Sequence, residues 1–217
     1  MEKSRVGIII PALNEQDSIA KVVKSVAQYG IPIVVDDGST DLTRVNAIKS
    51  GAIVHSHEKN RGYDSALGSG FEVAHEMGMN FVITMDADGQ HNAEILEKFI
   101  SELDNQVDLV IGSRDRFQRV SEKIFSVLSK KIWHISDPLC GMKGYRMSLY
   151  LERGAFDTYM SVGTELAIYA ASKRKAIKEL NIVTRDRDGS SRFGGAIKAN
   201  ARILTSLIQG ILRYGFY

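Results

Sequence analysis

The stretch FVITMDADGQH, residues 81–91, places two acids directly after an apolar run. Phe81–Met85 has the apolar, β-branched character of a strand that is buried on both faces of a parallel sheet. Asp86 and Asp88 follow it, two residues apart. In an open α/β sheet, ligands bind beyond the carboxyl ends of the strands, so this position predicts a functional site.

The pattern of an apolar run followed by a helix-length segment repeats through the first 112 residues. The predicted strands are Val6–Ile10, Ile33–Val35, Ile53–His55, Phe81–Met85 and Leu109–Ile111. The predicted helices are Ser18–Tyr29, Leu42–Ser50, Ser65–Met77 and Ala93–Leu103. This alternation predicts an α/β fold with right-handed βαβ units and a mostly parallel sheet that carries helices on both faces.

The second half of the chain is less regular. Its predicted elements are the helices Val120–His134, Thr164–Lys173 and Ala196–Arg213, the strand Ile177–Val183 and the polar loop Arg185–Gly195. No Pro- or Ser-rich linker separates the two halves. The sequence therefore predicts one domain over residues 1–217, in which residues 113–217 complete a site begun by residues 1–112.

The composition is that of an ordinary globular protein: 217 residues, 44% hydrophobic and 25% charged, with three prolines. Such values exclude a disordered chain and a disulfide scaffold. The single cysteine, Cys140, has no partner for an intramolecular disulfide, which fits a reducing, cytoplasmic location. No apolar run approaches the roughly 18 residues that a membrane span needs.

The net charge of +2 conceals a split between the halves. Residues 1–112 carry a net charge of −8, and residues 113–217 carry +10. A basic half suits phosphate, nucleic acid or an anionic membrane as a partner, whereas an accident of surface composition is the alternative. Aromatic and basic residues are not interleaved in any recognisable nucleic-acid motif, so we expect no nucleic-acid partner.

The acids after the strands offer two kinds of chemistry. Asp86 and Asp88 can aim at one cation, and their oxygens, with Gln90 as a third ligand, suit Mg²⁺ or Mn²⁺. The alternative is a polar turn or a cap for the next helix. Asp36 and Asp37 can likewise accept hydrogen bonds from a nucleobase or ribose, or can serve the next helix N-terminus.

Seven short motifs then occur in order along the chain. They are PALNE (11–15), DDGSTD (36–41), NRGY (60–63), DADGQH (86–91), GSR (112–114), DPLCG (137–141) and RDGSSR (187–192). Together they resemble the inverting family-two glycosyltransferases of the GT-A fold, a Rossmann-like, mostly parallel sheet. Within that family the chain is most similar to the dolichyl- or polyprenyl-phosphate mannose or glucose synthases, over about residues 6–195.

The resemblance implies a nucleotide-sugar donor, such as a GDP- or UDP-hexose, and a divalent metal, Mg²⁺ or Mn²⁺. It implies that the 1–112 half binds both of them and that a polyprenyl phosphate accepts the hexose. The nucleotide contacts that it implies are Pro11, Asn14, Glu15 and Asp37, with the loop glycines Gly38 and Gly62. The metal and diphosphate residues that it implies are Asp86, Asp88 and Gln90. Arg114 then lies near the acceptor phosphate, and Arg187 and Arg192 lie on a loop that closes over the diphosphate.

The chain also departs from the family pattern. Arg192 stands where lysine is usual, and the RDGSSR loop is shorter than some versions. Tyr63 follows Gly62 where small residues are often found, which leaves the sugar preference open. No Gln-x-x-Arg-Trp motif follows, so a processive polysaccharide synthase is not indicated.

The chemical class of the acceptor determines which residues are needed for transfer. A phosphate monoester has a second pKa of about 6, so a lipid phosphate needs cations rather than a base, and Arg114, Arg116 and Arg119 are candidates. A hydroxyl acceptor needs a carboxylate base, for which Asp137 is the candidate; a capping or turn role is its alternative. A non-catalytic nucleotide-sugar-binding protein is a further alternative.

The last predicted helix is amphipathic. Its apolar residues include Ile197, Leu204 and Ile208, interleaved with Lys198 and Arg202. Such a helix either lies at a membrane surface near a lipid acceptor or packs on the domain or on a partner in a homodimer. Cys140 and Trp133 are predicted to pack in the core.

Overall fold

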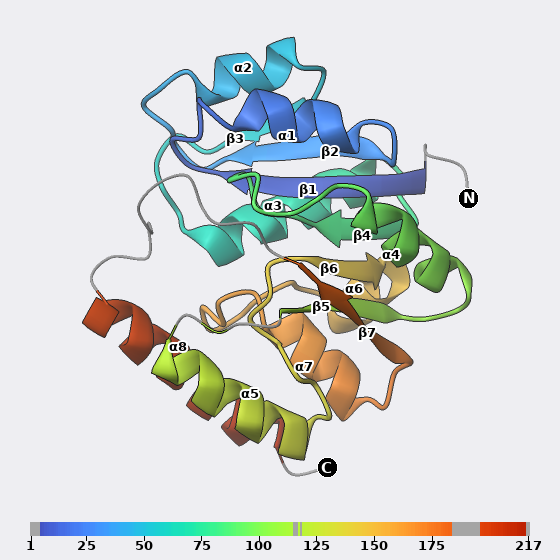
Figure 1. Cartoon of the computed structure of the whole chain (residues 1–217), viewed down its shortest axis with the longest axis vertical. Helices are drawn as coiled ribbons and strands as arrows, with labels where there is room; N and C mark the ends of the chain where they lie inside the picture. Colours follow the sequence, from blue (N-terminus) through green and yellow to red (C-terminus); the bar gives the residue numbers. More distant parts are fainter. Residues whose placement is uncertain (1–4, 115–116, 118, 184–195, 216–217) are drawn as a thin grey trace.

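The computed structural model describes residues 5–114, 117, 119–183 and 196–215. Its centre is one sheet of seven strands in the order β3-β2-β1-β4-β6-β5-β7 (Figure 1). The strands are β1 Val6–Ala12, β2 Ile31–Asp36, β3 Ile53–Ser56, β4 Phe81–Thr84, β5 Leu109–Arg114, β6 Lys143–Arg146 and β7 Ile177–Ile182. All pairings are parallel except those of β6, which runs antiparallel to both β4 and β5.

Helices cover both faces of this sheet (Figure 1). The helices are α1 Ile19–Val26, α2 Thr43–Lys49, α3 Tyr63–Glu76, α4 Ile95–Asp104, α5 Val120–Ile132, α6 Met147–Arg153, α7 Glu165–Ser172 and α8 Ala196–Tyr214. The core of one face comes from α1, α2 and α4, and the core of the other comes from α3 and α5 to α8. The fold is therefore the predicted α/β class, with a mostly parallel sheet between two helical layers.

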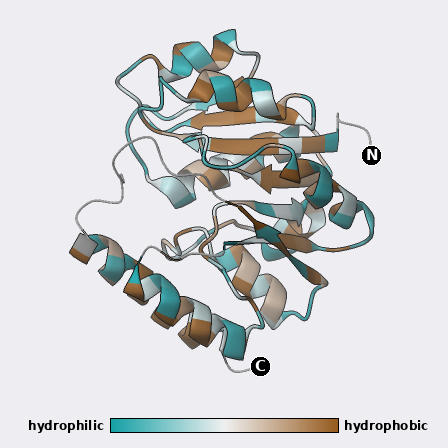
Figure 2. Ribbon diagram, in the orientation of Figure 1, coloured by the Kyte–Doolittle hydropathy of each residue, from teal (hydrophilic) through white to brown (hydrophobic). Residues whose placement is uncertain are grey.

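The strands divide their side chains between the two cores. Along β1, Ile8 and Ile10 join the core beside α1, whereas Ile9 joins the core beside α3, because successive strand residues point to opposite faces. The central strands β1 and β4 are accordingly hydrophobic along their length, as Figure 2 shows for the centre of the sheet. This two-sided burial explains why the apolar runs predicted the central strands correctly.

Two elements were not predicted from the sequence: β6 (Lys143–Arg146) and α6 (Met147–Arg153). The reason for missing β6 is local, because the segment KGYR has charged ends and no apolar run. It becomes a strand through antiparallel pairing with β4 and β5 on either side. The other predicted helices and strands are present, with ends that shift by at most three residues. The predicted polar loop Arg185–Gly195 lies outside the described residues.

Gly70 sets how closely α3 approaches β1. A Cβ at Gly70 would lie 2.4 Å from Cγ2 of the buried Ile9, whereas a Cβ at Gly68, on the same helix, would meet only the Phe156 Cβ at 4.0 Å. We expect Gly70→Ala to lower the free energy of unfolding by about 1–3 kcal/mol through overpacking. Gly68→Ala, the matched control, is expected to leave it unchanged or raise it by up to about 1 kcal/mol. Urea titration measures both, and equal effects would show that the clash is relieved elsewhere.

Candidate active site

The carboxyl ends of β1, β2 and β4 meet at one edge of the sheet. These strands are neighbours in the order β2-β1-β4, so the loops that follow them lie side by side. The predicted site motifs at 11–15, 36–41 and 86–91 begin at these three strand ends. The topology thus brings together residues that are up to 80 positions apart in sequence.

The loop after β1 is fastened to the loop after β2. Asn14, whose φ is +50°, donates its backbone N–H to Ser39 Oγ at 2.9 Å and accepts from the Thr40 N–H at 2.8 Å. The Glu15 backbone N–H donates to Thr43 Oγ1, and its carboxylate accepts from the Ser18 hydroxyl. Pro11 lies within β1 itself, opposite Val35. Asn14 and Glu15 therefore hold the two loops together. Their nucleotide contacts remain a prediction.

Asp37 organises the segment that leads into α3. Its buried carboxylate accepts from the backbone N–H groups of Arg61 and Gly62, both at 2.8 Å, and lies 2.7 Å from His57 Nδ1. The other ring nitrogen of His57 is 3.0 Å from Ser69 Oγ in α3. His57 was not among the predicted site residues, because a lone histidine after a strand carries no motif.

Two glycines permit this arrangement. A Cβ at Gly38, which has φ +77°, would lie 2.7 Å from the Asn60 backbone nitrogen, so only glycine allows the two loops to touch. Gly62 has φ +94° at the N-terminus of α3. Both predicted loop glycines are thus required by the backbone around the Asp37 carboxylate.

Asp86 lies at the centre of the site. Its side chain is 35% exposed, accepts a hydrogen bond from the Tyr63 hydroxyl at 3.3 Å and lies 3.8 Å from His91 Nε2. Burial alone would raise the pKa of Asp86, but the nearby His91 ring and the Tyr63 hydroxyl outweigh it, so this pKa lies below its usual value. Asp86 is consequently ionised at neutral pH, and Asp88 lies on the following turn, accepting from the Gln90 N–H at 3.1 Å.

A second loop presses against Asp86. A Cβ at Gly141 would lie 2.3 Å from Asp86 Oδ2, so any side chain at this position would collide with the carboxylate. The Thr84 hydroxyl, at the end of β4, donates to the Gly141 carbonyl at 2.7 Å and fixes the approach. The segment 137–141 therefore forms one wall of the site.

The residues at this centre fit a divalent metal that binds together with a diphosphate. Within the described residues, no group of three or more His, Cys, Asp or Glu side chains is arranged to hold a metal ion alone. Mg²⁺ is commonly bound by one or two carboxylates and completes its shell with waters and substrate phosphates. Asp86 is ionised and part-exposed, and Asp88 follows it two residues later in the chain. These two carboxylates are the kind of ligands that Mg²⁺ uses together with water and phosphate.

Arg114 and Asp137 form a bidentate ion pair. Asp137 is 1% exposed, and its two carboxylate oxygens accept from Arg114 Nε at 2.7 Å and Nη2 at 2.9 Å, with the Arg114 backbone N–H at 3.1 Å. Burial would lower the pKa of Arg114, but the hydrogen bonds and charge of Asp137 raise it instead. A carboxylate held in this way is poorly placed to take a proton from an acceptor.

A second buried carboxylate extends this pair. Glu122, on the first turn of α5, lies 3.8 Å from Arg114 Nη2 and accepts from Arg119 Nη1 at 3.0 Å. The cluster of Arg114, Arg119, Glu122 and Asp137 thus alternates in sign and balances in charge. Two of the three arginines expected near an acceptor phosphate already have carboxylate partners; the third, Arg116, is outside the described residues, as are Arg187 and Arg192.

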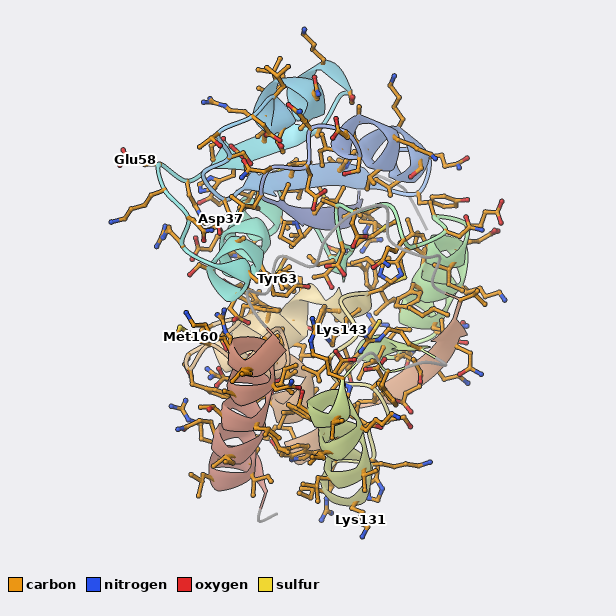
Figure 3. All side chains as sticks on the ribbon, turned by 60° about the vertical axis from the view of Figure 1, so that its left-hand side comes forward. Asp37, Glu58, Tyr63, Lys131, Lys143 and Met160 are labelled. Carbon is orange, nitrogen blue, oxygen red and sulfur yellow. The ribbon has the colours of Figure 1, made fainter. Side chains whose placement is uncertain are left out.

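Lys143 is a further residue that the sequence did not indicate. It is buried at the start of β6, and its ammonium group donates to the carbonyls of Cys140 at 2.5 Å and Gly163 at 3.1 Å. Burial lowers its pKa, against the charges of nearby groups that include Asp86. In the view of Figure 3, the labelled side chain of Tyr63 lies between those of Asp37 and Lys143.

Cys140 and Trp133 pack in the core, as predicted. Burial raises the pKa of the Cys140 thiol to about 12, so the thiol stays protonated at neutral pH. A nucleophilic role for Cys140 is therefore not supported.

Comparisons with known proteins agree with this geometry. The family model for glycosyl transferase family 2 matches residues 7–180. An uncharacterized protein of Methanocaldococcus jannaschii is 34% identical, over 80% of this chain and 69% of its own length. An undecaprenyl-phosphate 4-deoxy-4-formamido-L-arabinose transferase of Edwardsiella ictaluri is 33% identical, over 87% of this chain and 63% of its own length.

Solved structures share the fold. A crystal structure of glucosyl-3-phosphoglycerate synthase from Mycobacterium tuberculosis, in complex with Mn²⁺ and UDP-glucose, superposes with a TM-score of 0.77 at 23% identity. The superposition covers 98% of this chain and 79% of that one. The sheet and the helical layers thus form the GT-A fold.

This protein belongs to glycosyl transferase family 2. The predicted family, the GT-A fold and the assignment as a glycosyltransferase are confirmed. The polyprenyl-phosphate branch, the individual site residues and a homodimer stay predictions.

Proposed function

We propose that this protein is a metal-dependent, inverting glycosyltransferase that moves a hexose from a nucleotide-diphosphate sugar to a polyprenyl phosphate. The observation that carries the proposal is the part-exposed Asp86 at the carboxyl edge of the sheet, which accepts a hydrogen bond from Tyr63 and packs against the Gly141 loop. In an open α/β sheet this edge is where a nucleotide binds.

The donor and its metal occupy the first half of the site. Asp86 and Asp88, with Gln90 next to them, would hold Mg²⁺ or Mn²⁺, and the metal would supply positive charge to stabilise the leaving nucleoside diphosphate. The loops 11–15 and 36–41 face the nucleotide, and Asp37 fixes the segment beside them that carries Gly62, a predicted nucleotide contact. The structural neighbour solved with Mn²⁺ and UDP-glucose supports a donor of this class.

Inversion requires attack on the anomeric carbon from the side opposite the diphosphate. A bond forms between an acceptor oxygen and that carbon as the carbon–oxygen bond to the diphosphate breaks, and the nucleoside diphosphate departs. A phosphate oxygen is already ionised at pH 7 and needs no base. The engagement of Asp137 with Arg114 favours this acceptor over a hydroxyl, for which Asp137 was the predicted base.

The similar proteins suggest two classes of phosphorylated acceptor. The Edwardsiella relative is named for an undecaprenyl phosphate, whereas the structural neighbour is named for phosphoglycerate. The lipid acceptor is favoured by an exposed apolar face on α5 and α8.

Helices α5 and α8 run parallel and pack side by side (Figure 1). Ser121, at the start of α5, donates to the Asn200 side chain, and the Trp133 indole at its end donates to the Tyr214 carbonyl. Both helices expose apolar side chains, from 41% for Ile124 to 85% for Ile197. The exposed apolar residues are Val120, Ile124 and Val127 on α5 and Ile197, Ile208 and Leu212 on α8.

The charges around this α5–α8 face have one sign. Helix α8 contains no acid, and the single acid of α5, Glu122, is buried. The cations on the two helices are Lys123, Lys130, Lys131, Lys198, Arg202 and Arg213. A basic, apolar helical face fits an anionic lipid surface, whereas two such faces would repel one another in a dimer. Among the described residues, no helix is long and apolar enough to cross a membrane.

Vesicle binding tests the α5–α8 face. We expect the protein to sediment with vesicles that contain phosphatidylglycerol, less so with pure phosphatidylcholine, and least at high salt. Replacing Val127 and Ile208 together with serine should weaken binding by about tenfold or more, because each side chain contributes apolar area. Val45→Ser with Ile48→Ser, on the exposed surface of α2, is the matched control. Binding that is insensitive to the first pair would contradict the proposed face.

Transfer assays test the function itself. Labelled GDP- and UDP-hexoses are supplied with Mn²⁺ or with a chelator, against undecaprenyl phosphate, 3-phosphoglycerate or a phosphate-free alcohol. The proposal expects metal-dependent transfer to undecaprenyl phosphate with inversion at the anomeric carbon. Transfer to 3-phosphoglycerate alone would replace the lipid acceptor by the soluble one, and binding without transfer to any acceptor would favour a non-catalytic protein.

A further inference from the structure

A cavity of about 600 Å³ opens beside the Asp86 site. Its walls come from the Asn60–Gly62 loop, from Tyr159 and Met160, and from α8. Tyr63 follows Gly62 directly and donates its hydroxyl hydrogen bond to Asp86, so the cavity starts one residue from the acid site. We call it the α8 cavity; its α8 wall lies beyond residues 7–180, which the family model matches.

Two arginines from distant parts of the chain converge on the α8 cavity. Arg61 comes from the loop before α3, and Arg202 comes from the second turn of α8. Among the residues that the structure describes, no acid lines the cavity, and Asn60 and Thr205 add polar groups. Arg202 is 3.8 Å from the carboxylate of Asp64, whereas Arg114 and Arg119 donate hydrogen bonds to buried carboxylates at 2.7 and 3.0 Å.

Arg202 keeps donors available for a ligand. Its Nη2 lies 3.8 Å from the buried carboxylate of Asp64, and its side chain is 41% exposed. A guanidinium group has five N–H donors in a planar fork, so one carboxylate at this distance does not exhaust them. Asp64 thus orients the guanidinium from behind while its remaining edge faces the cavity.

The opposite wall is backbone held in an unusual conformation. Met160 and Val162 both have φ +57°, which is an outlier for a β-branched residue such as valine. The conformation is fixed by Asp64, which accepts from the N–H groups of Val162 and Gly163, and by Lys143, which donates to the Gly163 carbonyl. Strained backbone that is held by several partners clusters at ligand sites.

The same segment links the cavity to the acid site. A Cβ at Gly163 would lie 3.1 Å from the Tyr63 ring, and Tyr63 contacts Asp86 on its other side. Lys143 joins the Gly163 carbonyl to that of Cys140, in the loop that presses on Asp86. The segments that line the α8 cavity therefore continue into residues that contact Asp86, which connects the cavity to the Asp86 site.

We propose that the α8 cavity binds the phosphate group of the acceptor, with Arg61 and Arg202 as its cations. The inference rests on the proposed function and deepens it by giving the acceptor a binding site. A phosphate monoester carries between one and two negative charges at pH 7, which matches two arginines in a cavity without acids. Either a lipid phosphate or a small phosphorylated acid supplies this chemistry, and α8 carries both the cavity residues and the exposed apolar residues that favour a lipid.

Binding without a donor tests the α8 cavity separately from transfer. Calorimetry with farnesyl phosphate and with 3-phosphoglycerate represents the two sources, and farnesol and glycerate are the matched probes without phosphate. We expect the wild type to bind at least one phosphorylated probe and neither phosphate-free one. Arg61→Gln and Arg202→Gln should each weaken that binding by about tenfold or more, and Arg202→Lys by less, because it keeps the charge.

Two controls separate a binding role from a structural one. Arg174→Gln removes an exposed arginine from the turn after α7, away from the cavity, and should change the dissociation constant by less than about twofold. Binding of UDP and Mn²⁺ should be retained in Arg202→Gln, whereas a distorted site would lose it as well.

The outcomes are distinct. Three results would overturn the α8 cavity as the phosphate site. They are wild-type affinity in both Arg202→Gln and Arg61→Gln, an equal loss of affinity in Arg174→Gln, and no binding of either phosphorylated probe to the wild type. Phosphate binding that depends on both arginines, without transfer to any acceptor, supports the cavity and instead overturns the proposed function.

Discussion

Replacing Asp86 with asparagine is expected to lower the rate of sugar transfer by about 10³-fold, equivalent to about 4 kcal/mol of transition-state stabilisation. The substitution keeps the shape of the side chain and removes its charge. In the proposed function that charge would hold the divalent cation, and the surroundings of Asp86 keep its pKa below the usual value. The reaction should lose its transition-state charge balance while the fold persists, because Asp86 is part-exposed.

The comparison is made by measuring kcat/KM at saturating Mn²⁺ together with the thermal midpoint. Asp104→Asn, which neutralises an exposed acid at the end of α4, is the matched control and should retain full activity. The wild type should gain thermal stability from Mn²⁺ with UDP, and Asp86→Asn should lose most of that gain. Asp86→Asn with wild-type kcat/KM would exclude the carboxylate from the metal centre.

The strand-end acids could be predicted from sequence because their signal is local. The runs Val6–Ile10 and Phe81–Met85 are buried on both faces, so their composition marks them as central strands. Once these strands are parallel neighbours, topology alone brings the residues after them to one edge. The prediction of Asp86 and Asp88 as a pair therefore needed no knowledge of distant contacts.

The residues that the sequence did not indicate act through distant contacts. Lys143 binds the Gly163 carbonyl, and Tyr63 binds Asp86, over 20 and 23 positions respectively. Asp64 holds Gly163 across 99 positions. No local pattern marks such residues, because a buried lysine or aspartate is tolerated only when partners from elsewhere in the chain are present. The antiparallel β6, which carries Lys143, was missed for the same reason.

The pairing of Arg114 with Asp137 carries the second large prediction. Asp137→Ala is expected to lower the free energy of unfolding by about 3–5 kcal/mol, because it leaves the buried Arg114 guanidinium without its main partner. For a chain of this size the thermal midpoint should fall by roughly 10 °C. Transfer should fall with it, since Asp137 anchors the loop whose Gly141 presses on Asp86. Thermal unfolding measured alongside kcat/KM gives both quantities.

A double-mutant cycle separates this structural pair from the predicted base. If the two residues act as an ion pair, Arg114→Met should lower the free energy of unfolding less in an Asp137→Asn background than in the wild type. Asp137→Asn has then already removed the carboxylate that Arg114→Met would leave buried without its partner. If Asp137 is instead a catalytic base, Asp137→Asn should abolish transfer to a hydroxyl acceptor and leave the thermal midpoint at the wild-type value. Because both oxygens of Asp137 accept from Arg114, we expect coupling of about 1.5–3 kcal/mol in stability. Additive effects on stability, with loss of activity confined to hydroxyl acceptors, would restore Asp137 as the base.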